Sequence, residues 1–110
     1  MIVVVVGVCG SGKTTLVKNL RDNGINAYNV AQEHSCIKKL WKHKNPNKVI
    51  MLDATYETIQ KRRGVLWGKE TLFEQHDRLK DAKNNTDLFI KTDDLTIAEV
   101  TNVALMFLQQ

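Results

Sequence analysis

Residues 7–14 combine the residue types and the spacing that bind phosphate groups in proteins. They read Gly-Val-Cys-Gly-Ser-Gly-Lys-Thr and satisfy the pattern G-x-x-x-x-G-K-[ST] at every fixed position. Glycines allow the backbone to wrap around phosphate oxygens with its N–H groups pointing inward, and the start of a following helix adds partial positive charge. In such a loop Lys13 would contact the outer phosphates, and the Thr14 hydroxyl would be a ligand of Mg²⁺.

The segments on either side of this loop are expected to position it. Residues 2–6 are all β-branched, which predicts a strand that is buried on both faces, as in a parallel sheet. After the loop, apolar residues recur at helical spacing and Asn23-Gly24 provides a stop, so we predict a helix over residues 13–23. A strand, a glycine-rich loop and a helix in this order form the context in which the motif binds phosphate.

The rest of the chain alternates predicted strands with predicted helices. We expect strands over residues 25–31, 48–52 and 87–91, and helices that follow Ser35, Thr55, Thr71 and Thr96. Thr71 with Glu74 and Thr96 with Glu99 have the spacing of capping boxes. The apolar faces expected on these last two helices are Leu72, Phe73, Leu79 and Ala82, and then Ile97, Val100, Val103, Ala104 and Phe107.

This alternation predicts an α/β layered fold with right-handed crossovers, formed by one domain over residues 1–110. A composition of 43% hydrophobic and 25% charged residues agrees with a globular domain. No stretch of about 18 apolar residues occurs, and residues 1–6 are too short for a membrane span or a signal sequence. We therefore expect a cytoplasmic protein without a membrane partner, in which Cys9 and Cys36 are free thiols.

The net charge of +4 favours acidic partners, such as nucleotides, phosphorylated metabolites or nucleic acid. Nucleic acid is disfavoured, because aromatic residues make up only 6% of the chain and Trp41 and Trp67 are isolated, so no stacking platform is evident. His34, Cys36 and His43 lack the spacing and the fourth ligand of a zinc site.

The loop and its flanking segments resemble the Walker A region of the P-loop NTPases. Residues 10–15 look like the small-molecule kinase branch, such as shikimate, gluconate, adenylylsulfate and nucleoside monophosphate kinases. The resemblance implies a three-layer α/β fold with a short, mainly parallel sheet of about four strands. It also implies ATP or another nucleoside triphosphate with Mg²⁺, bound by Gly7, Cys9, Gly10, Ser11, Gly12, Lys13, Thr14 and Thr15.

Later segments extend this resemblance. Residues 49–54, followed by a helix that ends in Lys61-Arg62-Arg63, are similar to the late strand and arginine-bearing lid of those kinases. Residues 87–95 look like their last strand and the following loop, which would place a purine base near residues 92–95. Those kinases usually have five parallel strands and substrate-binding insertions, so one strand-helix unit is missing here.

The missing unit leaves two interpretations of Asp53. It is either the metal-side carboxylate, acting with Thr14 beside the phosphate loop, or only the carboxylate that ends the late strand, where it would precede a helix without binding a ligand. We favour the metal-side role.

Phosphoryl transfer requires positioned cations and a carboxylate near the attacking group. In the resembled kinases an acid follows the second strand, which makes Glu33 the candidate base. Arg62 and Arg63 are candidates to fold over the phosphates, with Arg78 in a similar role. Residues 64–69 form a candidate hinged lid, in which Trp67 covers either the nucleotide or the core. The expected catalytic set is therefore Lys13, Glu33, Asp53, Arg62 and Arg63.

Two functions remain open at this stage. The first is an ATP-dependent phosphotransferase that moves the γ-phosphate to a small-molecule acceptor, and the second is a nucleotide-binding regulatory or accessory module with little catalysis of its own. The chain lacks the Asn-Lys-x-Asp motif that reads guanine, which favours ATP over GTP without deciding between them. A four-stranded domain leaves sheet edges and limited core, which a homodimer would cover.

Overall fold

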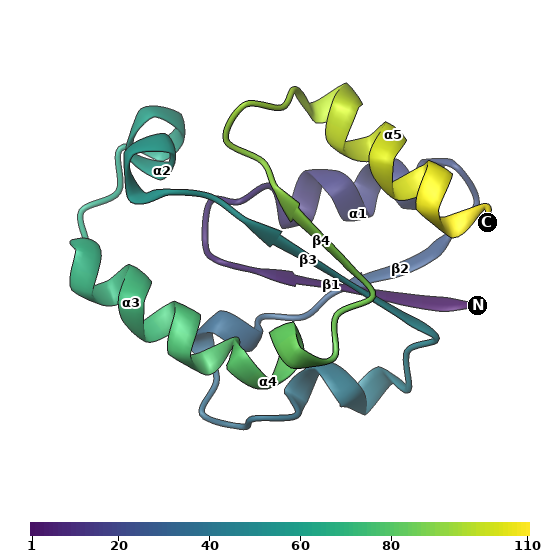
Figure 1. Ribbon diagram of the computed structural model, residues 1–110, viewed down its shortest axis with the longest axis horizontal. Helices are drawn as coiled ribbons and strands as arrows, with labels where there is room; N and C mark the ends of the chain where they lie inside the picture. Colours follow the sequence, from purple (N-terminus) through teal and green to yellow (C-terminus); the bar gives the residue numbers. More distant parts are fainter.

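Four parallel strands form the centre of the molecule in a computed structural model that describes residues 1–110 (Figure 1). The strands are β1 (Ile2–Gly7), β2 (Asn26–Asn29), β3 (Lys48–Asp53) and β4 (Leu88–Lys91). Their order across the sheet is β2-β1-β3-β4, and every neighbouring pair is parallel. The expected α/β fold with a short parallel sheet of four strands is therefore confirmed.

Helices cover both faces of this sheet. The α-helices are α1 (Lys13–Asp22), α2 (Tyr56–Arg63), α3 (Lys69–Arg78), α4 (Lys80–Asn84) and α5 (Ile97–Leu108), and two 3₁₀ helices are η1 (Gln32–His34) and η2 (Leu40–Lys44). Alternate valines of β1 point to opposite faces: Val3 and Val5 pack with α1 and α5, whereas Val4 and Val6 pack with the layer of α3, α4 and η2. Both faces are apolar, as the β-branched run predicts.

The carboxyl ends of the strands meet at one edge of the sheet, and the phosphate loop leaves β1 there. Gly7 lies beside Leu52 of β3 and has a φ of 156°. A Cβ atom at Gly7 would approach the carbonyl oxygen of Leu52 to 2.3 Å, so only glycine permits this close contact between loop and strand.

Two predicted helices differ from the observed ones. The segment after Ser35 contains only the 3₁₀ helix η2, and Ile37 is exposed. The buried side chain of Gln32 donates to the carbonyl of Ile37 and accepts from the amide of Trp41. The side chain of Gln32 thus satisfies backbone groups that would otherwise bond within an α-helix, which explains why this segment needs no α-helix.

The predicted start of the next long helix and the place of Phe73 on its apolar face were also wrong. Helix α3 begins at Lys69, two residues before Thr71, and no side chain caps it. The buried positions of α3 and α4 are Leu72, Gln75, Leu79 and Ala82, whereas the Phe73 side chain is 76% exposed. Gln75 lies on the buried face, where its side chain accepts a hydrogen bond from the Cys9 amide of the phosphate loop.

The other caps agree with the sequence. Thr55 accepts a hydrogen bond from the Thr58 amide at the start of α2, and Thr96 with Glu99 forms the expected capping box of α5. On α5, Val100 and Ala104 are buried, but Ile97 and Val103 are exposed. None of the helices combines the length and the apolar character that crossing a bilayer requires.

Candidate functional site

A cavity of about 670 Å³ lies over the phosphate loop at the carboxyl edge of the sheet. Residues 9–16 form its floor, and Asn29, Ala31 and Glu33 form the wall that follows β2. The end of α2 contributes Arg62 and Arg63, and α5 contributes Ile97, Val100 and Thr101. This volume lies within the range of pockets that hold small-molecule ligands and cofactors.

The floor of the cavity offers backbone donors. The amides of Gly10, Gly12, Lys13, Thr14 and Thr15 donate to no acceptor within the chain. Gly12 adopts a φ of 104° immediately before α1, a left-handed conformation that suits glycine. Free amides at the start of a helix form an anion-binding site, so the loop fits the phosphate groups of a nucleotide.

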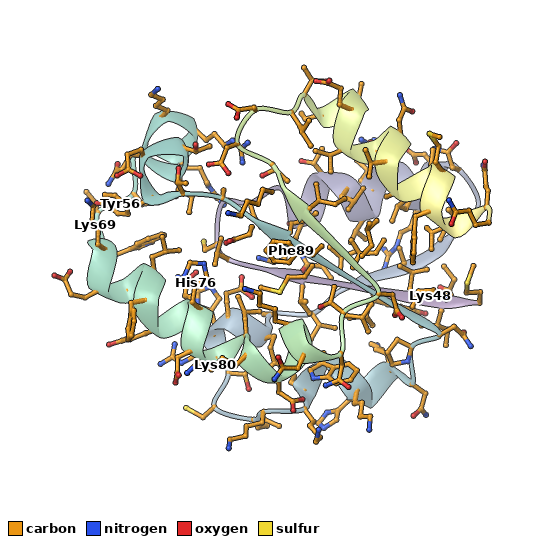
Figure 2. All side chains as sticks on the ribbon, viewed as in Figure 1. Lys48, Tyr56, Lys69, His76, Lys80 and Phe89 are labelled. Atoms are coloured by element: carbon orange, nitrogen blue, oxygen red, sulfur yellow. The ribbon has the colours of Figure 1, made fainter.

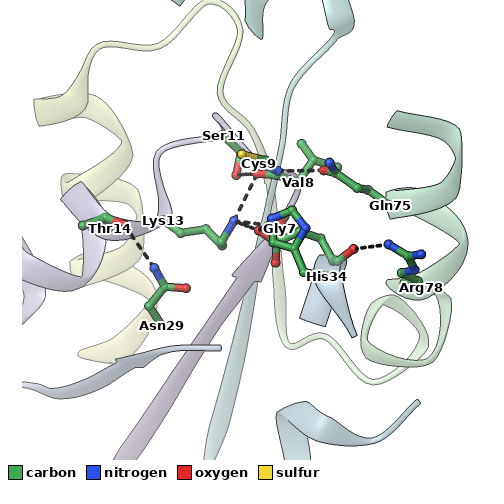
Figure 3. A network of polar contacts seen from close by, with 11 residues as sticks. Gly7, Val8, Cys9, Ser11, Lys13, Thr14, Asn29, His34, Gln75 and Arg78 are labelled. Carbon is green, nitrogen blue, oxygen red and sulfur yellow. Dashed lines mark hydrogen bonds and ion pairs between the residues drawn. The ribbon is translucent and has the colours of Figure 1, made fainter. Parts of the chain in front are cut away.

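Lys13 and Glu33 form a buried ion pair inside this cavity. The side chains are 7% and 3% exposed, and Lys13 Nζ lies 2.5 Å from Glu33 Oε2. Lys13 also donates to the carbonyl oxygens of Gly7 at 2.9 Å and Val8 at 3.2 Å (Figure 3). The second carboxylate oxygen of Glu33, Oε1, has no hydrogen-bond partner although it is buried.

An unpartnered buried carboxylate oxygen is costly, by about 1–3 kcal/mol or more. Glu33 is also the only carboxylate among the residues that line the cavity. Arg78 of α3 donates to the backbone carbonyl of Glu33 at 3.3 Å, which helps to hold η1 in place (Figure 3). One carboxylate oxygen of Glu33 therefore keeps its capacity to accept a hydrogen bond or a proton unused within the chain.

Asn29 is a site residue that the sequence analysis missed. It lies at the end of β2, the strand next to β1, and its Nδ2 atom donates to the Thr14 hydroxyl at 3.2 Å (Figure 3). The Thr14 hydroxyl and the Asn29 amide oxygen are oxygen donors of the kind that Mg²⁺ prefers. A polar residue in a strand was visible in the sequence, but only the pairing of β2 with β1 brings it to Thr14.

Asp53 lies outside this cavity. It ends β3 and contacts His76 of α3, with 2.9 Å between Oδ1 and the histidine Nε2; His76 lies on the side of α3 that faces the sheet (Figure 2). The structure thus joins Asp53 to α3, whereas Asn29 is hydrogen-bonded to Thr14 and Glu33 to Lys13.

Arg62 and Arg63 differ in their surroundings. Arg62 donates to the carbonyl of Thr92 at 2.6 Å, to the Thr92 hydroxyl at 3.0 Å and to the carbonyl of Gly10 at 3.3 Å. Arg63 lines the cavity, and its side chain makes no hydrogen bond or ion pair within the chain. Arg63 is therefore the guanidinium that remains available for phosphate, while Arg62 joins α2 to the loop after β4. Arg78 lies outside the cavity.

The predicted lid over residues 64–69 and the predicted place of the purine base near residues 92–95 do not coincide with the cavity. Trp67 packs against Tyr56, with 6.0 Å between ring centroids, and against the core, so it covers the core and not the cavity. Residues 92–95 do not line the cavity. Its apolar end is formed instead by Leu16, Ile97 and Val100.

Helix α3 supports the loop from the other side. The Oε1 atom of Gln75, a buried side chain, accepts a hydrogen bond from the Cys9 amide at 2.9 Å (Figure 3).

Asp93, in the loop after β4, accepts hydrogen bonds from the amide and the hydroxyl of Thr55 at the start of α2. Burial raises the pKa of Asp93, but hydrogen bonds from Thr58 and Thr55 outweigh it and lower this pKa to about 2.

A parallel sheet with helices on both faces, a glycine-rich loop between β1 and α1, and a buried lysine at its end define a P-loop NTPase fold. Residues 3–85 match the model of a family described as an AAA domain. The match covers most of the chain, which therefore belongs to this family within the P-loop NTPase superfamily. No curated protein matches the chain.

Proposed function

We propose that this protein binds ATP with Mg²⁺ and transfers the γ-phosphoryl group to a hydroxyl of a small acceptor. The observation that carries the proposal is the buried pair of Lys13 and Glu33, which leaves one carboxylate oxygen unpartnered at the cavity. A buried carboxylate beside the lysine of the phosphate loop provides a group that can accept the proton of an acceptor hydroxyl. The small-molecule kinase branch combines both groups in one site.

The loop would bind the nucleotide mainly through backbone amides that have no partner within the chain. The amides of residues 10 and 12–15 face phosphate oxygens, and Lys13 and Arg63 neutralise their charge. Mg²⁺, when bound, supplies further charge neutralisation on the outer phosphates. Thr14 and Asn29 are the residues that would hold it.

Transfer then follows as a direct displacement. The acceptor oxygen forms a bond to the γ-phosphorus, and the bond between that phosphorus and the bridging oxygen breaks. ADP leaves with the electron pair of the broken bond. The proton of the acceptor hydroxyl passes to Glu33, whose unpartnered Oε1 is available to accept it.

The experiment is a titration with a fluorescent ATP analogue and Mg²⁺, followed by ADP release across a panel of small acceptors. Lys13→Ala should weaken nucleotide binding about 10- to 100-fold, because it removes charged hydrogen bonds to phosphate. Lys80→Ala is the control, since Lys80 is exposed and does not line the cavity. Acceptor-stimulated ADP release by the wild type supports the proposal.

Removal of Lys13 alone leaves Glu33 buried without a cation, which can destabilise the fold. The double variant Lys13→Met/Glu33→Gln removes both charges and should fold, with a nucleotide affinity weakened about as much as in Lys13→Ala. Binding by the wild type without turnover for any acceptor would contradict the kinase function. It would favour the accessory module instead, whose nucleotide state would alter the affinity for a partner.

A further inference from the structure

A second cavity, of about 490 Å³, adjoins the first at the free edge of the sheet. The two cavities share Thr14 and Asn29, the residues joined by a hydrogen bond at 3.2 Å. The remaining residues that line the second cavity are Val17, Lys18, Arg21, Asp22, Tyr28 and Lys44. No step of the proposed reaction uses these six residues, so the role of this second cavity is open.

Two cations meet at the ring of Tyr28 in this cavity. Arg21 comes from α1, and its guanidinium carbon lies 5.4 Å from the ring centroid. Lys44 comes from η2 on the other side of the sheet, and its Nζ lies 4.6 Å from the same centroid. The two charges are therefore no more than about 10 Å apart, the sum of these distances. Cation–π contact with Tyr28 and a bond from Arg21 Nε to the carbonyl of Ala27 hold them in place.

The charge in this cavity is not balanced by the protein. Lys18 pairs with Asp22 at 3.1 Å, which leaves Arg21 and Lys44 without a carboxylate partner. By contrast, Lys39 pairs with Asp81 and Lys80 pairs with Asp77 elsewhere on the surface. Two unpaired cations provide a charge of +2, and a phosphate monoester at neutral pH carries about −1.5 to −2. The terminal N–H groups of Arg21 also remain free, and their fork matches phosphate oxygens.

We propose that this second cavity binds the phosphate group of the acceptor, so that the substrate of the transfer is a small phosphate monoester that carries a free hydroxyl. This inference rests on the proposed function. Asn29 and Thr14 line both cavities, so an acceptor anchored at Arg21 and Lys44 could extend past them into the cavity that contains Glu33. The bonds formed and broken are those given above, and the phosphate of the acceptor is unchanged.

The first test measures binding of inorganic phosphate by calorimetry while the loop is saturated with ADP and Mg²⁺. Arg21→Ala and Lys44→Ala should each weaken phosphate binding about tenfold, the lower end for a charge-assisted hydrogen bond at an exposed site. Lys42→Ala is the matched control, because Lys42 lies on the same 3₁₀ helix outside the cavity. Arg21→Lys keeps the charge and should retain part of the affinity. Unchanged ADP affinity shows that each variant is folded.

The second test compares acceptors in pairs, such as a sugar phosphate and the same sugar without phosphate. ADP release should be stimulated by the phosphorylated member alone, and Lys44→Ala should raise its KM about tenfold. The phosphate monoester should also displace inorganic phosphate from the second cavity. Equal phosphate affinity in Lys44→Ala and Lys42→Ala, or equal stimulation by both members of a pair, would overturn the inference. Phosphate binding that depends on Lys44 without any stimulation of ADP release would overturn the proposed transfer and would identify a site for free phosphate only.

Discussion

Lys13 Nζ lies 2.5 Å from Glu33 Oε2, so the lysine of the phosphate loop and the only carboxylate of the cavity neutralise each other. A nucleotide phosphate would compete with Glu33 for the same ammonium group. Under the proposed function, contact of Lys13 with the phosphate would leave Glu33 without its ion-pair partner. The ion pair would then couple nucleotide binding to the release of Glu33, the proposed base.

Asn29→Ala should weaken the effect of Mg²⁺. The substitution removes the hydrogen bond to the Thr14 hydroxyl and an amide oxygen close to that hydroxyl. Loss of a residue that orients a metal ligand typically lowers metal affinity about 10- to 100-fold. The Mg²⁺ concentration that gives half-maximal nucleotide affinity should rise accordingly, while Asn29→Asp should restore it. An unchanged Mg²⁺ dependence in Asn29→Ala would remove Asn29 from the site.

Gln75→Leu should destabilise the protein and loosen the phosphate loop. The Cys9 amide would lose its acceptor in a region that α3 covers, at a cost of about 1–3 kcal/mol in the free energy of unfolding. Urea unfolding measures this cost. Phe73→Ala, two positions away on the exposed face, should change the same quantity by less than about 0.5 kcal/mol. The reverse order of the two effects would contradict the observed orientation of α3.

The sequence predicts the parts of this site that depend on neighbouring residues. The strand, the loop and the start of α1 are encoded by a β-branched run, by glycines and by helical spacing within residues 2–23, and the structure confirms them. The cap of α5 at Thr96 is equally local. Such features need no knowledge of the rest of the chain.

Features that depend on distant contacts were not predicted. Gln75 looks like a polar surface residue until α3 is packed against the loop, and a pattern that ranks residues by hydropathy assigns its place to Phe73. Asn29 reaches Thr14 only because β2 is the neighbour of β1. The surroundings of Asp53 also depend on a distant contact, because the position of α3 brings His76 to this carboxylate.

Asp93→Asn should change how stability depends on pH. The pKa of Asp93 is lowered from 3.8 to about 2, so its ionised form stabilises the native state. This contribution is complete above pH 3.8 and is lost as the pH falls through about 2. We expect the variant to be less stable by about 1 kcal/mol at pH 7, allowing for the partial exposure of the carboxylate, with the difference disappearing toward pH 2. Urea unfolding at several pH values measures it, and a difference that grows on acidification would have the wrong sign.

The central claim is that Glu33 accepts the proton of the acceptor. Glu33→Gln keeps the size of the side chain and removes its basicity, and a single-turnover measurement of γ-phosphoryl transfer, with the acceptor found to stimulate ADP release, tests it most directly. We predict nucleotide affinity within about threefold of the wild type and a transfer rate lower by about 10²- to 10⁴-fold. Transfer at the wild-type rate by Glu33→Gln would contradict the account.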